Sequence, residues 1–234
     1  MRHCLLFAVV LVPVGALAAQ VGYPPSNSPY HELDRGAFVE AFGGRVFGTG
    51  GLLRLGPRNG TSEGARLVVR AKNMLQFSFG GWTAGTEREV INAQDSVATR
   101  DKGLTPQRLI AGEIGIQLNL TGGKTWRGLA PYAGVSLGLV HGQGGPAVDT
   151  SGYSFGNKLF FAPTIGTRFY AAQRVYFKVD VRALFWKLDY PTSYSLEPTK
   201  QPGTLTQPNA VNVSGVTSQY TATPEIRFGV GIAW

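Results

Sequence analysis

Residues 225–234 read Glu225-Ile226-Arg227-Phe228-Gly229-Val230-Gly231-Ile232-Ala233-Trp234. From Ile226 onward every second residue is large and apolar, and the residues between them are small or charged. Because successive side chains of a β-strand point to opposite faces, this alternation predicts a strand with one wholly apolar face.

The same alternation recurs along the chain and predicts an all-β fold. In the first of these segments the pair Gly43-Gly44 permits a β-bulge that would exchange the two faces, although Glu40 is still expected to point inward. The seven further predicted strands are residues 37–47, 65–70, 75–80, 109–120, 129–140, 161–170 and 175–186.

The connections between these segments alternate in length. Residues 71–73, 121–127 and 171–174 form short connections, whereas residues 48–63, 85–107, 141–158 and 188–219 form long, polar ones. Short turns at one end and long loops at the other are typical of an eight-stranded antiparallel up-and-down β-barrel.

Charge patterning favours a membrane barrel over a soluble one. Charged residues make up only 15% of the chain, against about 25% in typical soluble domains. The apolar faces of the clearly alternating segments carry no Lys, Arg, Asp or Glu. Such a face suits lipid, where a basic side chain costs about 2–4 kcal/mol at the bilayer midplane. The opposite face then lines the lumen.

A barrel of eight strands has a narrow lumen that side chains fill. Six basic and four acidic residues share the inward face and would have to neutralise one another, since unpaired charges there are costly. The sequence therefore predicts an ion-paired plug and no wide pore. The predicted network comprises Glu40, Arg66, Arg70, Glu113, Arg168, Lys178, Asp180, Arg182, Glu225 and Arg227.

Aromatic residues near the predicted strand ends suit the lipid headgroup boundary. They are expected to form an interfacial girdle, with the rings at the edge of the hydrocarbon and the polar atoms toward the headgroups. The predicted girdle comprises Trp82, Tyr170, Tyr176, Trp186 and Trp234.

The N-terminus has the pattern of a removable export signal. Arg2 and His3 precede an apolar run that closes on Ala16-Leu17-Ala18, a small-x-small cleavage pattern. We therefore expect a signal peptide at 1–18, a periplasmic leader at 19–34 that acts as a linker, and the barrel at 35–234. Cleavage would remove Cys4, the only cysteine.

The export signal and the terminal strand together resemble those of the small eight-stranded outer-membrane β-barrels, the OmpA-like, OmpX-like and OmpW-like proteins. The resemblance implies a monomer integral to the outer membrane of a diderm bacterium, surrounded by lipid and lipopolysaccharide. It also implies that the barrel-assembly machinery recognises the terminal strand through Phe228, Val230, Ile232 and Trp234. The chain ends in Trp, where the commonest version of this signal has Phe.

No catalytic, cofactor-binding or metal-binding residues are expected. Gly123-Lys124-Thr125 lacks the rest of a phosphate-binding loop, and two distant histidines without cysteine do not make a zinc site. Some outer-membrane barrels are lipid A-modifying enzymes with a His-x-Ser type motif, but here the chain reads His141-Gly142-Gln143. A triad of His141 with Ser136 and Asp149 would require mutual hydrogen bonding.

The net charge of +8 does not indicate nucleic acid, since the basic residues divide between lumen and loops. Among the loop residues, Arg88, Arg100 and Lys102 are ordinary solvated charges or weak sites for lipopolysaccharide phosphates. The sequence favours a structural or surface-interaction role. Passage of small or apolar solutes and lipid A modification are the alternatives.

Overall fold

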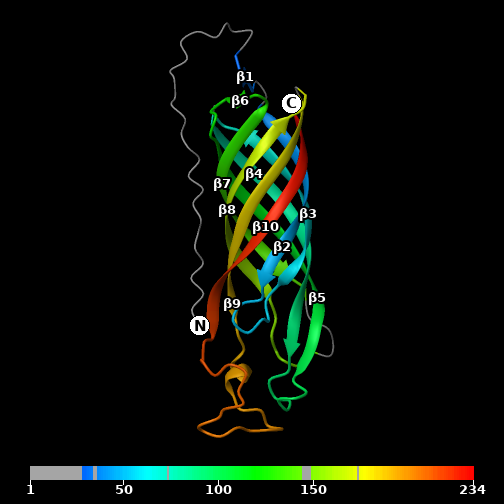
Figure 1. Cartoon of the computed structure of the whole chain (residues 1–234), viewed down its shortest axis with the longest axis vertical. Coiled ribbons are helices and arrows are strands. Elements are labelled where there is room, and N and C mark those ends of the chain that lie inside the picture. Colours follow the sequence, from blue (N-terminus) through cyan, green and yellow to red (C-terminus); the bar gives the residue numbers. More distant parts are fainter. Residues whose placement is uncertain (1–27, 34–35, 73, 144–148, 173) are drawn as a thin grey trace.

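The computed structural model describes residues 28–33, 36–72, 74–143, 149–172 and 174–234. Eight long strands close into an antiparallel barrel in which each strand pairs with the next and β10 pairs with β2 (Figure 1). The predicted signal peptide and most of the leader lie outside the described residues. The long strands are β2 (Ala37–Thr49), β3 (Arg58–Arg70), β4 (Leu75–Ile91), β5 (Asp101–Asn119), β7 (Leu129–Gly142), β8 (Gly156–Tyr170), β9 (Val175–Asp189) and β10 (Ser218–Ala233).

The strands are longer than the apolar alternation predicted. β3 begins at Arg58, β4 continues to Ile91 and β5 begins at Asp101, so much of the predicted loops 48–63 and 85–107 is strand. Backbone pairing does not require an apolar face, and the strands therefore continue beyond the part of the barrel that alternates. The connections are correspondingly shorter than predicted: the one between β4 and β5 comprises residues 92–100. The barrel wall therefore extends toward the long-loop end.

The bulge that Gly43-Gly44 would permit does not form in β2, where inward and outward residues alternate throughout. Glu40 points inward as expected. The register of β2 with β3 shifts instead between Val46 and Thr49, nearer the long-loop end.

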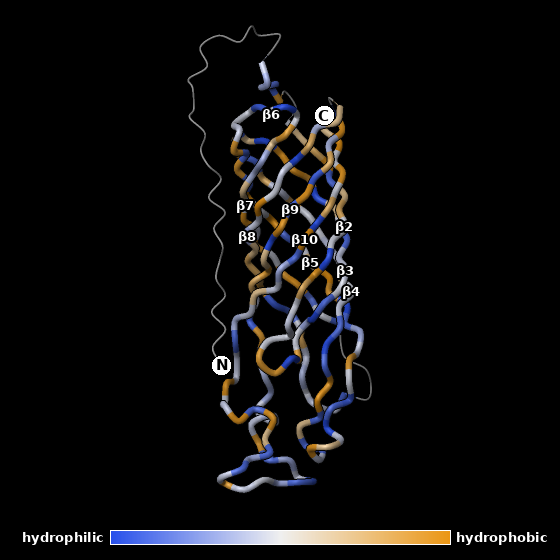
Figure 2. The backbone as a smooth tube through the Cα atoms, viewed as in Figure 1, coloured by the Kyte–Doolittle hydropathy of each residue, from blue (hydrophilic) through white to orange (hydrophobic). Residues whose placement is uncertain are grey.

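Large apolar side chains stand exposed on the outer face of the barrel. Along the backbone, hydrophilic residues become more frequent toward the long-loop end (Figure 2). Leu67, Phe79 and Ile114 are 38%, 52% and 59% exposed, as expected of side chains that meet lipid. The outer face is not wholly free of charge, however. Arg45 and Glu63 point outward. Arg45 lies in the strand whose faces the pair Gly43-Gly44 left open, and Glu63 lies in a segment that the sequence predicted to be a loop.

The predicted aromatic girdle is wrong for the residues that point inward. Trp82, Tyr176 and Trp186 are at most 4% exposed and lie in the lumen, and Tyr170 packs against the same interior. Of the five, Trp234 is exposed. Space for an inward ring comes from glycine on a neighbouring strand: a Cβ at Gly231 would lie only 2.1 Å from Cζ of Tyr176.

Two short strands lie at the short-turn end of the barrel (Figure 1). β1 (Tyr30–Glu32) pairs with β6 (Lys124–Trp126), which lies in the connection between β5 and β7. The leader is therefore not wholly a linker, because its last part adds to the sheet. The 3-10 helix η2 (Thr192–Ser195) lies in the connection between β9 and β10. No helix among the described residues is long and apolar enough to cross a membrane.

Candidate functional site in the lumen

The lumen is filled in three layers. Near the short turns, Phe38, Val68, Tyr176 and Ala233 form a buried apolar cluster, against which Tyr170 packs. A layer of charged side chains follows, and a larger apolar cluster closes the long-loop end. The charged layer is thus enclosed between two apolar ones.

Glu40 is the centre of the half of the charged layer that lies nearer the short turns. Its carboxylate accepts hydrogen bonds from Arg168 Nε at 3.2 Å and from Lys178 Nζ at 2.7 Å. Tyr176 donates its hydroxyl to the same group at 2.9 Å. Arg168 also donates to the side-chain oxygens of Gln76 and Gln117, at 2.9 and 2.5 Å. One acid from β2 therefore fixes side chains of β8 and β9.

Glu113 is the centre of the other half, which lies nearer the long loops. It accepts from Arg66 Nη2 at 2.8 Å, from Arg182 Nη1 at 2.6 Å and from the indole Nε1 of Trp82 at 3.1 Å. Arg182 Nε also donates to Glu225 at 2.5 Å. Four strands therefore meet at this second acid.

Asp180 links the two halves. It lies 3.0 Å from Lys178 Nζ, accepts from Arg227 Nε at 2.8 Å and accepts from the Tyr132 hydroxyl at 2.9 Å. Arg66 bridges the halves again, since its Nη1 lies 4.0 Å from Glu40. The layer is one continuous network.

The structure places all ten residues of the predicted network on the inner face, nine of them buried. Arg70 lies at the short-turn edge, where its guanidinium donates to the Leu33 carbonyl and stands over the Phe38 ring. Sequence reasoning missed the neutral hydrogen-bond partners of these ions, although each partner lies at an inward-pointing position of its strand. These partners are Ser62, Gln76, Trp82, Gln117, Tyr132 and Tyr176.

Among the described residues, the nine buried members of the network comprise five cations and four acids. Aromatic rings balance part of the excess: Arg168 lies 4.5 Å from the Tyr132 ring centroid and Arg227 lies 4.7 Å from that of Phe42. Such cation–π contacts are stronger where water is excluded. A cavity beside Arg66 measures about 10 Å³, room for at most one water-sized molecule.

The apolar cluster at the long-loop end of the lumen comes partly from the connections between strands. Phe155 precedes β8, and its ring packs edge-on against Trp186, 5.5 Å away. Leu55, Tyr153 and Tyr194 enter the same cluster from three different connections. The connections therefore fold into the mouth of the barrel.

No family model and no curated protein matches this sequence. Solved structures do match. The outer membrane protein OprG from Pseudomonas aeruginosa is 12% identical, with a TM-score of 0.51 over 89% of this chain and 99% of that chain. The chain has the fold of a small outer-membrane β-barrel. Neisserial surface protein A is 13% identical, with a TM-score of 0.49 over 85% of this chain and 97% of that chain.

The outer-membrane barrel fold agrees with the exposed apolar exterior, and together they support an integral outer-membrane location. The short turns then face the periplasm, and the long loops face the exterior.

The external loops of this outer-membrane barrel are tied to one another. Arg88 at the end of β4 donates to Asp149 of the β7–β8 connection, and Tyr194 of η2 donates its hydroxyl to the Ile91 carbonyl at 2.9 Å. Burial disfavours the charged form of Asp149, but hydrogen bonds from Arg88 and Ser151 outweigh it and lower the pKa of that carboxyl.

The loop bases offered above as sites for lipopolysaccharide phosphates all have partners within the loops. Arg88 contacts Asp149, Arg100 Nη1 donates to the Asn209 carbonyl at 2.8 Å, and Lys102 Nζ lies 3.0 Å from Asp95. These contacts favour a structural role for the three bases.

The residues of the tested triad do not meet. His141 lies on the outer face with its Nδ1 2.6 Å from Asn157 Oδ1, whereas Ser136 is buried on the inner face. Asp149 is engaged by Arg88 and Ser151. Among the described residues, no group of His, Cys, Asp and Glu has the arrangement of a metal site.

Proposed function

We propose that this protein is a non-conducting, non-enzymatic outer-membrane barrel that strengthens the envelope and presents ordered loops to external partners. The observation that carries the proposal is the three-layered filling of the lumen. A lumen filled in this way stabilises the barrel wall and leaves little room for a solute to pass. The separation of His141 from Ser136 supports the non-enzymatic part of the proposal.

The long β9–β10 connection has the order of a presented surface. Glu197 accepts hydrogen bonds from the backbone of Gly203 at 2.8 Å and of Asn209 at 3.1 Å, which fixes the tip of the loop. Gln201 accepts from the backbone of Val97 at 3.1 Å and so joins this loop to the β4–β5 loop. Leu205 stands fully exposed on the fixed tip. Preorganised loops lose less entropy on binding a partner.

Assembly and export are part of the proposal. Phe228, Val230, Ile232 and Trp234 form an exposed apolar row on the last strand, which supports recognition of that strand by the barrel-assembly machinery. We further propose that 1–18 is cleaved as a signal peptide and that the barrel is a monomer.

Conductance measurements test the closed lumen. Purified protein inserted into a planar bilayer is expected to show no current above the background of protein-free membrane, because the charged layer and both apolar layers block the axis. A known porin inserted under the same conditions controls for insertion. Stable unitary currents would favour the alternative of solute passage, and an altered lipid A profile in cells that lack the protein would favour the enzymatic one.

A further inference from the structure

Two arginines stand on the outer face of the barrel at the ends of one row of paired residues. Arg45 of β2 pairs with Thr61 of β3, Thr61 pairs with Gly85 of β4, and Gly85 pairs with Arg108 of β5. All four positions face outward and are exposed. Since neighbouring strands lie about 4.8 Å apart, the two arginine backbones are roughly 14 Å apart.

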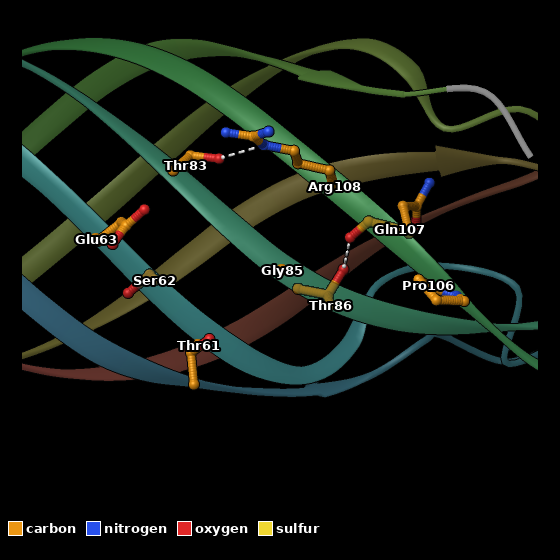
Figure 3. Close-up of a pocket in the computed structure, with 9 residues that line it drawn as sticks. All are labelled: Thr61, Ser62, Glu63, Thr83, Gly85, Thr86, Pro106, Gln107 and Arg108. Atoms are coloured by element: carbon orange, nitrogen blue, oxygen red, sulfur yellow. Dashed lines mark hydrogen bonds between the residues drawn. The ribbon is translucent and has the colours of Figure 1, made fainter.

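A groove of about 330 Å³ occupies the wall in this row (Figure 3). Its outward-facing lining includes Thr61, Glu63, Thr83 and Arg108, and Gly85 contributes no side chain. Figure 3 shows Arg108 directed toward Thr83, whose hydroxyl accepts a hydrogen bond from Arg108 Nε at 3.1 Å. The contact leaves the terminal guanidinium nitrogens for a ligand.

The groove lies where the outer face changes from apolar to polar. On the same strands, the outward residues nearer the short turns are Leu67, Phe79 and Ile114, all exposed. The next outward residue of β4 toward the long loops is Glu87. In an outer-membrane barrel, the headgroups of the outer leaflet are expected at such a boundary.

Arg108 and Thr61 line the groove, and Arg45 is paired with Thr61 just outside the groove lining. Guanidinium and hydroxyl groups of this kind are the chemistry that binds phosphate. The Glu63 carboxylate lies on the hydrocarbon side of the row and is an acceptor suited to sugar hydroxyl or amide groups. We propose that this groove binds the phosphorylated sugar headgroup of an outer-leaflet glycolipid. The inference goes beyond the proposed loop and envelope role and rests only on the outer-membrane location.

Native mass spectrometry of the detergent-solubilised full chain, titrated with diphosphoryl lipid A, tests the proposal. The double variant Arg45→Gln/Arg108→Gln is expected to bind roughly ten-fold more weakly, because it removes two charged hydrogen-bond donors that are exposed to solvent. The double variant Lys72→Gln/Arg174→Gln removes the same charge from the short turns and is expected to bind as the wild type does.

Glycine variants test the groove without removing charge. A Cβ at Gly85 or at Gly112 meets nothing within 4 Å, so isoleucine fits either position on the outer face. Gly85→Ile fills the groove and is expected to weaken binding, whereas Gly112→Ile, outside the groove lining, is expected to leave it unchanged. Glu63→Gln is expected to strengthen binding, since it removes a negative charge beside the phosphate.

Three results would overturn the proposal. Equal affinity for dephosphorylated lipid A would show that phosphate is not recognised, and an equal loss in the Lys72/Arg174 control would show a general charge effect. Binding of inorganic phosphate with the affinity of the lipid and the same sensitivity to the variants would assign the groove to a free anion. None of these results bears on conductance, so the proposed function stands or fails separately.

Discussion

Glu40→Ala is expected to lower the free energy of unfolding by about 3–5 kcal/mol, the usual cost of breaking a buried ion pair from one side. Glu40 is 1% exposed and accepts from Arg168, Lys178 and Tyr176. Alanine leaves Arg168 in the enclosed layer without its acid, and it leaves Lys178 with Asp180 alone. The double variant Glu40→Gln/Lys178→Met is expected to regain part of the loss, because it removes one positive charge from a layer that has lost one negative charge.

Urea unfolding in lipid vesicles, followed by tryptophan fluorescence, measures this effect. Glu63→Gln is the matched control, since it removes an exposed carboxylate from the neighbouring strand β3 and should shift the unfolding midpoint little. If Glu40→Ala unfolds at the same urea concentration as the control, the charged layer does not stabilise the barrel.

Gly231→Val is expected to destabilise the barrel by about 1–3 kcal/mol, the range for overpacking a close-packed interior. The nearest neighbours of a Cβ there are Cζ, the hydroxyl oxygen and Cε1 of the rigid Tyr176 side chain, at 2.1, 2.4 and 2.6 Å. Valine forces this ring away from Phe38, with which it packs edge-on at 5.8 Å, and away from Glu40.

The same unfolding assay distinguishes crowding from a general effect of glycine replacement. Gly112→Val places the same side chain on the open outer face and is expected to be neutral or slightly stabilising, since valine suits strands. Tyr176→Phe removes the hydroxyl but keeps the ring, and so isolates the lost hydrogen bond to Glu40. Equal stability of the Gly231 and Gly112 variants would contradict the proposed packing.

The sequence was sufficient for the closed barrel and for the inward direction of the charged residues. A charged side chain is strongly disfavoured in hydrocarbon. Because Lys178, Asp180 and Arg182 lie on the same face of one strand, that face must line the lumen. Tyr176 and Trp186 lie on the same face. Their assignment to a girdle is wrong because the face on which a side chain lies, and not its nearness to a strand end, decides whether it meets lipid.

Strand ends and partners were less accessible to sequence reasoning. Residues 58–63 and 85–91 carry polar side chains on both faces, so they lack the alternation that identifies a half-buried strand. β1 and β6 have three residues each, too few to show a period. The partner of each ion depends on how strands distant in sequence align around the barrel, which no local pattern records.

The charged layer also constrains the order in which the barrel forms. Glu40 lies 128 residues from Arg168 and 138 residues from Lys178 along the chain. No single hairpin contains both partners, so an isolated hairpin crossing the bilayer would carry uncompensated charges, which hydrocarbon strongly disfavours. Membrane insertion and neutralisation of the lumen are therefore coupled, and the barrel is expected to enter the bilayer cooperatively, with first and last strands brought together before its charges leave water.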